Sequence, residues 1–209
     1  MKIIPTILTD DSDKALEQIE ALRGVADWLQ IDVMDGTMTD SSTFDLYDLV
    51  GEVNDFQIEV HLMVNNPEEY FDACETLAAE RVYFHLESVE SPSFILEKME
   101  YFSFERGMVL SPQTDVDSII PYIDDIQAIQ IMTVAPGKQG QSFIPEMLDK
   151  VRELKKDYSD KWVSVDGGVN EGNLKEVQDS GVDAAGVGSA VMGVSDIAGA
   201  YEDLVKMAG

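Results

Sequence analysis

The sequence is poor in basic residues. It has 14 Lys and Arg against 41 Asp and Glu in 209 residues, which gives a formal net charge of −27 at pH 7. Such a surface repels nucleic acid and anionic lipid, so we expect neither a nucleic-acid partner nor a membrane partner. The acidic residues are scattered through the expected helices rather than gathered in a tail, which indicates solvated faces that keep the protein soluble. Adaptation to high salt is a secondary interpretation.

Cysteine and long apolar runs are also scarce. A single cysteine, Cys74, excludes an intramolecular disulfide and a cysteine metal cluster, and it is best interpreted as a small buried hydrophobic residue. No run of about 18 consecutive apolar residues predicts a membrane span, and residues 1–5 lack the apolar segment of a signal peptide. We therefore expect a cytoplasmic protein. Because no linker or low-complexity segment interrupts the chain, residues 1–209 are predicted to form one domain.

The sequence does contain a regular alternation of strand and helix patterns. Eight short runs rich in β-branched and apolar residues are predicted strands: Ile3–Leu8, Trp28–Val33, Gln57–Leu62, Arg81–Leu86, Glu105–Leu110, Gln127–Met132, Lys161–Val165 and Asp183–Gly188. Helical patterns between and after them are Ser12–Leu22, Pro67–Ala78, Pro145–Lys155, Asn173–Asp179 and Tyr201–Met207. Because right-handed crossovers place each strand beside its predecessor, this order predicts a single-domain (β/α)₈ TIM barrel, although an open doubly wound sheet has the same local pattern.

Ionisable side chains stand at the ends of three predicted strands. Asp32 follows Gln30 at a spacing of two, so both side chains lie on one face of the second strand. His61 is at the end of the third strand, and Asp166 follows the seventh. Because the C-terminal ends of barrel strands form the active site, Asp32, His61 and Asp166 are expected to converge. A turn cap explains any one of them alone, but packing gives no simple reason for all three.

This set of residues favours proton transfer next to a carbonyl group. Of two facing carboxylates, one can remove a proton and the other can return one on the opposite face, which inverts a stereocentre. The enediolate formed between these steps carries negative charge beside two acids, so the site needs an electrophile. A divalent metal held by carboxylate and imidazole is the usual solution.

Glycine-bearing loops follow the last three predicted strands and suggest phosphate binding. Their backbone N–H groups are accessible, and such loops commonly hold phosphate in barrels of this type, although a glycine pair alone is only a turn signal. Lys138 could add a positive charge. The residues concerned are Gly137, Lys138, Gln139 and Gly140 after the sixth strand, Gly167 and Gly168 after the seventh, and Gly188 and Ser189 after the eighth.

Several of these segments, taken in order, resemble the ribulose-phosphate 3-epimerase family over nearly the whole chain. The matching segments are Pro5–Leu8, Asp32–Gly36, His61–Met63, Met132–Val134, Pro136–Gly137, Val165–Gly168 and Gly188–Ala190. The resemblance implies interconversion of D-ribulose 5-phosphate and D-xylulose 5-phosphate, with Asp32 and Asp166 as the acid/base pair at carbon 3. It also implies a divalent metal ion, Zn, Fe or Mn, bound by Asp32, His61 and Asp166.

The same resemblance extends to the substrate. It implies a small phosphorylated sugar as ligand and places methionines beside the enediolate at Met34, Met63 and Met132, where core packing is an equally good interpretation. A homo-oligomer is also compatible with the family, but the sequence identifies no interface. The implied substrate-binding residues are Thr6, His61, Gly137, Lys138, Gln139, Gly140, Gly167, Gly168, Gly188 and Ser189.

Gln30 is the main departure, because it occupies the position of a metal-binding histidine in the family. A neutral amide oxygen is a poorer ligand for zinc or iron than imidazole. Three outcomes remain open: an altered metal site that prefers an oxygen-tolerant ion such as manganese, a metal-independent variant, or loss of the epimerase reaction. His85, which matches a common family histidine, is expected to have a structural hydrogen-bonding role.

Further departures lie in the substrate-facing loops, at residues 37–44 and at Lys138–Gln139. They leave two alternatives to the pentose-phosphate epimerase. One is a related enzyme, either an epimerase of another phosphosugar such as a hexulose phosphate or a lyase of the same superfamily. The other is a catalytically degenerate barrel that only binds phosphorylated sugar, an interpretation that Gln30 motivates.

Overall fold

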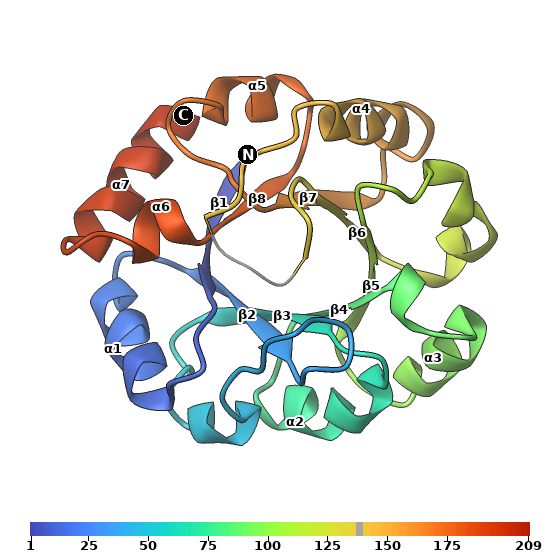
Figure 1. Cartoon of the computed structure of the whole chain (residues 1–209), viewed down its shortest axis with the longest axis horizontal. Coiled ribbons are helices and arrows are strands. Elements are labelled where there is room, and N and C mark those ends of the chain that lie inside the picture. Colours follow the sequence, from blue (N-terminus) through green and yellow to red (C-terminus); the bar gives the residue numbers. More distant parts are fainter. Residues whose placement is uncertain (137–139) are drawn as a thin grey trace.

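The fold is a closed barrel of parallel strands. A computed structural model describes residues 1–136 and 140–209. Figure 1 looks into the barrel and shows the strands as an inner ring. Each strand pairs with the next in sequence, and β8 pairs with β1, so the open-sheet alternative is excluded. The strands are β1 Lys2–Ile7, β2 Trp28–Met34, β3 Gln57–Met63, β4 Arg81–His85, β5 Glu105–Leu110, β6 Ala128–Met132, β7 Trp162–Asp166 and β8 Ala184–Val187.

Helices surround the barrel as an outer ring (Figure 1). The α-helices are α1 Ser12–Leu22, α2 Phe71–Thr76, α3 Pro92–Met99, α4 Met147–Asp157, α5 Leu174–Asp179, α6 Ser189–Met192 and α7 Ile197–Ala208. Short 3₁₀ helices complete the connections: η1 Leu46–Leu49, η2 Pro67–Tyr70, η3 Leu86–Ser88, η4 Val116–Ser118 and η5 Ile120–Asp125. Within the described chain, no helix is long and apolar enough to cross a membrane.

Helix α1 illustrates why these segments are helical. Asp11 caps it by accepting hydrogen bonds from the backbone N–H groups of Asp13 and Lys14, which otherwise lack partners at a helix start. Its buried face includes Ile19 and Leu22, at 1% and 0% exposure. Burial of one such side chain contributes roughly 1.5–3 kcal/mol. The helix therefore holds its place mainly through its apolar face against the barrel.

The strands bury both faces, and alternation decides which side chain goes where. In β3, Ile58, Val60 and Leu62 join the large apolar cluster that the helices also form. The intervening Glu59 and His61 then face the barrel interior, because successive side chains point to opposite faces. A second, smaller apolar cluster consists of Tyr83, Val109, Ala128, Met132 and Val134.

The N-terminal end of the barrel is filled by aromatic and charged side chains. The guanidinium carbon of Arg81 lies 4.7 Å from the ring centre of Trp162 and 5.6 Å from that of Trp28. Arg81 Nη1 also pairs with Glu59 Oε2 at 3.2 Å. These contacts occupy the end of the barrel opposite the site described next.

Cys74 is buried, as expected, and burial raises its pKa to about 12.

Candidate active site

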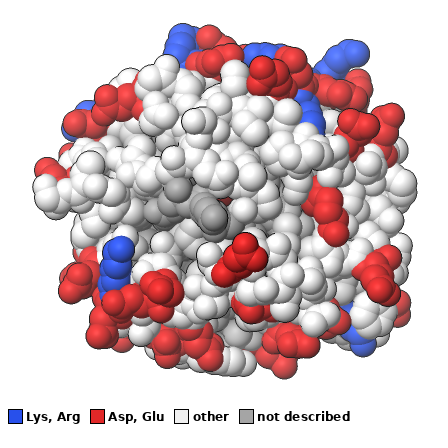
Figure 2. Space-filling model, in the orientation of Figure 1, with Lys and Arg blue, Asp and Glu red and all other residues white. Residues whose placement is uncertain are grey.

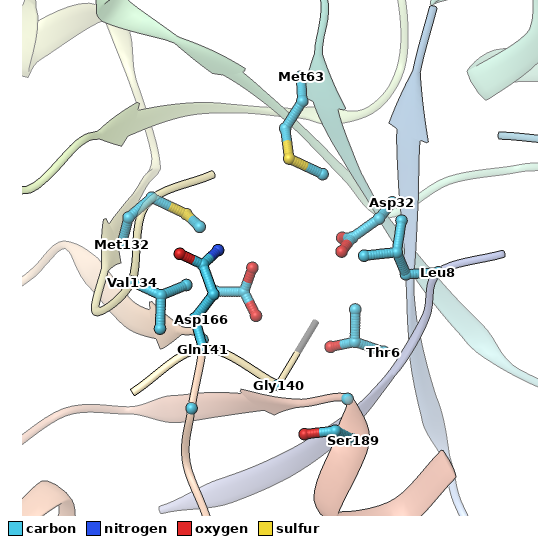
Figure 3. A pocket seen from close by; sticks show the side chains of 13 residues that line it. Thr6, Leu8, Asp32, Met63, Met132, Val134, Gly140, Gln141, Asp166 and Ser189 are labelled. Carbon is cyan, nitrogen blue, oxygen red and sulfur yellow. The ribbon is translucent and has the colours of Figure 1, made fainter. Parts of the chain in front are cut away.

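A pocket lies at the C-terminal ends of the strands. Figure 3 shows the carboxylates of Asp32, from β2, and Asp166, from β7, pointing toward one another across it. Figure 2 shows that acidic side chains greatly outnumber basic ones around the rim of this face. The lining residues are Thr6, Leu8, Asp32, Met63, Met132, Val134, Gly140, Gln141, Asp166, Gly167, Gly168, Gly188 and Ser189.

Strand register sets the height of the ionisable groups. Asp32 on β2 pairs with His61 on β3, so the two side chains leave the barrel wall at one level. Asp166 on β7 pairs with Gly186 on β8. A Cβ atom at Gly186 would lie 2.7 Å from Asp166 Oδ1 and 3.2 Å from Thr6 Oγ1. The absence of a side chain at Gly186 therefore gives the Asp166 carboxylate its place in the pocket.

One nitrogen of His61 joins the two carboxylates. His61 Nδ1 is 3.3 Å from Asp32 Oδ1 and 3.4 Å from Asp166 Oδ2. The imidazole is fully buried beneath the pocket, at 0% exposure, and the two aspartates are buried as well. The structure thus brings together the three groups that the strand-end pattern selected.

Burial and the charges of neighbouring groups shift the pKa values of Asp32 and His61. Burial, with a further contribution from the charge of Asp166, raises the pKa of Asp32 to about 6, although hydrogen bonds from His61 and Gln30 oppose the rise. For His61, burial lowers the pKa, but the hydrogen bonds to Asp166 and Asp32 outweigh it and raise the pKa to about 9. A carboxyl group that titrates near neutral pH is suited to both giving and taking a proton.

The donor set and its spacing fit a divalent metal ion. Ligand atoms of Asp32, His61 and Asp166 all lie within 4.8 Å of one another. Two ligands held about 2.0–2.1 Å from a tetrahedral centre are about 3.3–3.4 Å apart, which matches the separations of His61 Nδ1 from the two carboxylate oxygens. Gln30 stands beside them, and its Nε2 donates to Asp32 Oδ1 at 2.8 Å. Its amide nitrogen therefore faces the carboxylate in place of an imidazole.

Behind His61 lies a second layer of polar contacts. His61 Nε2 is 2.8 Å from His85 Nε2, and the two rings stack with centres 5.0 Å apart. Burial lowers the pKa of His85 to about 4. Gln130 Nε2 approaches His61 Nδ1 at 3.3 Å. Gln130 was not among the residues predicted from the sequence. Its spacing gave a signal, since it precedes Met132 by two residues just as Gln30 precedes Asp32.

The glycine-bearing loops border the same pocket. Gly167 and Gly168 adopt φ of 111° and 70°, a left-handed region that favours glycine. Gly140, Gly188 and Ser189 also line the pocket. Thr6 Oγ1 is buried and has no hydrogen-bond partner among the described residues. Gly137, Lys138 and Gln139 of the predicted phosphate loop lie outside the described residues.

The apolar side of the pocket differs partly from expectation. Met63 and Met132 line it, while Met34 is buried but is not one of the described lining residues. Leu8 and Val134 also line it and were not selected from the sequence. Both lie just beyond the end of a strand, and apolar residues at such positions carry no distinctive pattern.

Comparison with known proteins gives the same family by two routes. A sequence model of the Ribulose-phosphate 3 epimerase family matches residues 2–192. Ribulose-phosphate 3-epimerase of Mycobacterium tuberculosis (strain ATCC 25618 / H37Rv) is 32% identical over 213 residues, covering 99% of this chain and 93% of its own. The enzyme of the same name from Bacillus subtilis (strain 168) is 33% identical over 204 residues, covering 94% of each.

Solved structures share the fold at lower sequence identity. A crystal structure of 3-hexulose-6-phosphate synthase superimposes with a TM-score of 0.73 at 18% identity and covers 99% of both chains. At that identity the likeness extends to the barrel alone.

Proposed function

The chain belongs to the ribulose-phosphate 3-epimerase family, and from this we propose that it interconverts D-ribulose 5-phosphate and D-xylulose 5-phosphate by proton transfer at carbon 3. The observation that carries the proposal is the opposition of Asp32 and Asp166 across one pocket. Inversion of a carbon requires proton transfer on both of its faces, and two opposed carboxyl groups can provide it.

In the proposed reaction, one carboxylate takes the proton from carbon 3 and an enediolate remains. The carboxylic acid on the other side then gives a proton to the opposite face of the same carbon. In the reverse direction the two groups exchange roles. The raised pKa of Asp32 supports this exchange, because both forms of the group are then populated near neutral pH.

The residues present would hold a divalent metal ion through Asp32, His61 and Asp166. When bound, such an ion stabilises negative charge on the oxygens of the enediolate. Because Gln30 supplies an amide and no imidazole, we infer a preference for an ion that accepts oxygen ligands, such as manganese, over zinc or iron. Met63 and Met132 line the pocket and exclude water from the reacting carbon.

We assign the phosphate group of the substrate to the glycine-bearing side of the pocket. Gly168, Gly188 and Ser189 offer backbone N–H groups there with little side chain in the way. Local donors are needed, because the net charge of −27 opposes an anionic ligand. We also assign Thr6 Oγ1 to a substrate hydroxyl, because this oxygen borders the pocket and has no hydrogen-bond partner among the described residues. We further infer that residues 1–209 form one domain that acts in the cytoplasm.

The test is direct. Purified protein is incubated with ribulose 5-phosphate, alone and with Mn²⁺, Zn²⁺ or Fe²⁺, and xylulose 5-phosphate is measured. Product formation is expected, and absence of turnover with every metal would contradict the proposal.

Gln30 motivates a second candidate function, that of a barrel which binds phosphosugar without converting it. Tight binding of ribulose 5-phosphate without exchange of the hydrogen on carbon 3 would identify that function. Turnover of a hexulose phosphate in preference to the pentose would identify a related epimerase.

A further inference from the structure

A chain of buried contacts runs outward from the pocket through β4. His61 Nε2 meets His85 Nε2 at 2.8 Å, and both rings are fully buried. On its far side, His85 Nδ1 lies 3.5 Å from Glu87 Oε2 and 3.4 Å from Ser111 Oγ. The side chain of Glu87 is 28% exposed. The two imidazole rings therefore connect the proposed active site to the carboxylate of Glu87, which lies beyond the end of β4.

Hydrogen-bond chemistry favours one arrangement of hydrogens along this chain. A carboxylate only accepts hydrogen bonds and the Ser111 hydroxyl can accept one, so both neighbours of His85 Nδ1 are satisfied when this nitrogen carries the hydrogen. A neutral imidazole has one N–H, which leaves His85 Nε2 bare. His61 Nε2, 2.8 Å away, must then be the donor. The ring position of His61 that can lose or gain a hydrogen is consequently Nδ1, which faces Asp32 and Asp166.

Glu87 is itself held in place. Its Oε1 accepts the backbone N–H of Ser111 at 2.8 Å. The segment after β5 that supplies this N–H is fixed by Lys150 of α4, whose Nζ donates to the carbonyl oxygens of Ser111, Pro112 and Thr114 at 3.2, 2.9 and 2.6 Å. Although burial opposes it, hydrogen bonds from His85, Thr114 and Ser111 lower the pKa of Glu87 to about 2, so it is a carboxylate at neutral pH.

We propose that Glu87 is a positioning residue that acts through His85 to keep a hydrogen on Nε2 of His61, so that Nδ1 is the atom offered to the active site. The inference rests on the proposed function only in taking this pocket as the active site. An imidazole held in this form presents its Nδ1 lone pair to a divalent cation after releasing a single proton. Removal of such an outer carboxylate typically weakens metal binding by about 10- to 100-fold.

The isosteric substitution Glu87→Gln tests the arrangement. The backbone N–H of Ser111 can only donate, so the amide oxygen of the new side chain should face it and the NH₂ group should face His85 Nδ1. His85 must then accept at Nδ1 and carry its hydrogen on Nε2, and His61 must surrender its own Nε2 hydrogen. The substitution should therefore move the hydrogen of each imidazole ring from one ring nitrogen to the other, while the side-chain shape at position 87 stays the same.

Ring ¹⁵N NMR of histidine-labelled, metal-free protein reads these positions directly, because the chain has only two histidines. In the wild type we expect hydrogen on His85 Nδ1, and in Glu87→Gln on His85 Nε2. The exposed Glu90→Gln variant is the matched control for loss of one charge and should look like the wild type. Hydrogen on His85 Nε2 in the wild type, or an unchanged His85 in Glu87→Gln, would overturn the proposal.

Zn²⁺ titration of the same proteins gives a second readout. Glu87→Gln should bind Zn²⁺ about 10- to 100-fold more weakly than Glu90→Gln, with equal melting temperatures, and equal affinities would overturn the proposal. Neither measurement uses substrate. A failure to epimerise would therefore count against the proposed function and leave this inference intact.

Discussion

Gln30 Nε2 donates a hydrogen bond of 2.8 Å to Asp32 Oδ1, both side chains lying on the interior face of β2. The amide thereby engages one oxygen of a carboxylate that also faces His61 and the pocket. In most metal sites an imidazole or carboxylate would be expected at such a position. The amide keeps the carboxylate oriented but brings neither charge nor a strong ligand.

The substitution Gln30→His should strengthen metal binding. It adds an imidazole beside Asp32, His61 and Asp166 and completes a set of four ligands, which is the preferred number for zinc. We expect Zn²⁺ affinity to rise at least about 10-fold, which is the smallest change typical when an outer residue of a metal site is altered. Competition with a chelator measures this affinity. Gln57→His, at the opposite end of β3, controls for adventitious binding by a new histidine. Equal affinities for the two variants would contradict the assignment of the metal ligands.

Gly186→Ala should impair catalysis while the fold survives. The new Cβ would lie 2.7 Å from Asp166 Oδ1, which is the free end of a side chain and can move aside. A displacement of about 1 Å at a reacting group can cost about 100-fold in rate, so we expect a fall of that order in kcat with little change in melting temperature. Gly172→Ala, on the exposed loop before α5, is the control. Full activity in Gly186→Ala would show that Asp166 does not need this position.

The order of elements could be predicted because it depends on local pattern. Runs of β-branched residues separated by single helices predict a parallel barrel, and α1 begins and ends where its cap and apolar spacing indicate. The pattern at Pro67–Ala78 predicted one helix, whereas the chain forms η2 followed by α2, which ends at Thr76. Tertiary packing decides such boundaries, and α7 likewise begins at Ile197, ahead of the predicted start.

The site could be predicted only in part. Asp32, His61 and Asp166 were selected because barrel topology brings strand ends together. The contact of His85 with Glu87 could not be found in the same way, because Glu87 follows β4 in η3 and the pairing depends on where the chain turns. Opposition of the carboxylates across the pocket also required coordinates, since register and side-chain direction are set by the closed sheet.

Glu59 should make the stability of the metal-free protein depend on pH. Burial raises its pKa from 4.5 to about 7, an effect that the nearby Arg81 only partly offsets. The folded state therefore holds this proton more tightly than the unfolded chain, and the free energy of unfolding should fall as pH rises through that window. At about 1.4 kcal/mol per pKa unit, the loss is roughly 3 kcal/mol.

The measurement for Glu59 is a difference between two proteins. Urea unfolding of the wild type and of Glu59→Gln is followed between pH 4.5 and 7, and their difference isolates Glu59 from the other titrating groups. The wild type should lose stability relative to the variant across this range. Parallel curves would show that the buried carboxyl titrates as it does in the unfolded chain.

Hydrogen exchange at carbon 3 tests the two-carboxylate mechanism most directly. Wild type, Asp32→Asn and Asp166→Asn are incubated with ribulose 5-phosphate in D₂O, and deuterium at carbon 3 is measured in both pentose phosphates. Loss of one general acid or base costs about 10²- to 10⁴-fold, so we expect wild-type xylulose 5-phosphate to carry deuterium and neither variant to form it at a comparable rate. Wild-type product without deuterium, or either variant converting substrate at the wild-type rate, would contradict proton transfer by Asp32 and Asp166.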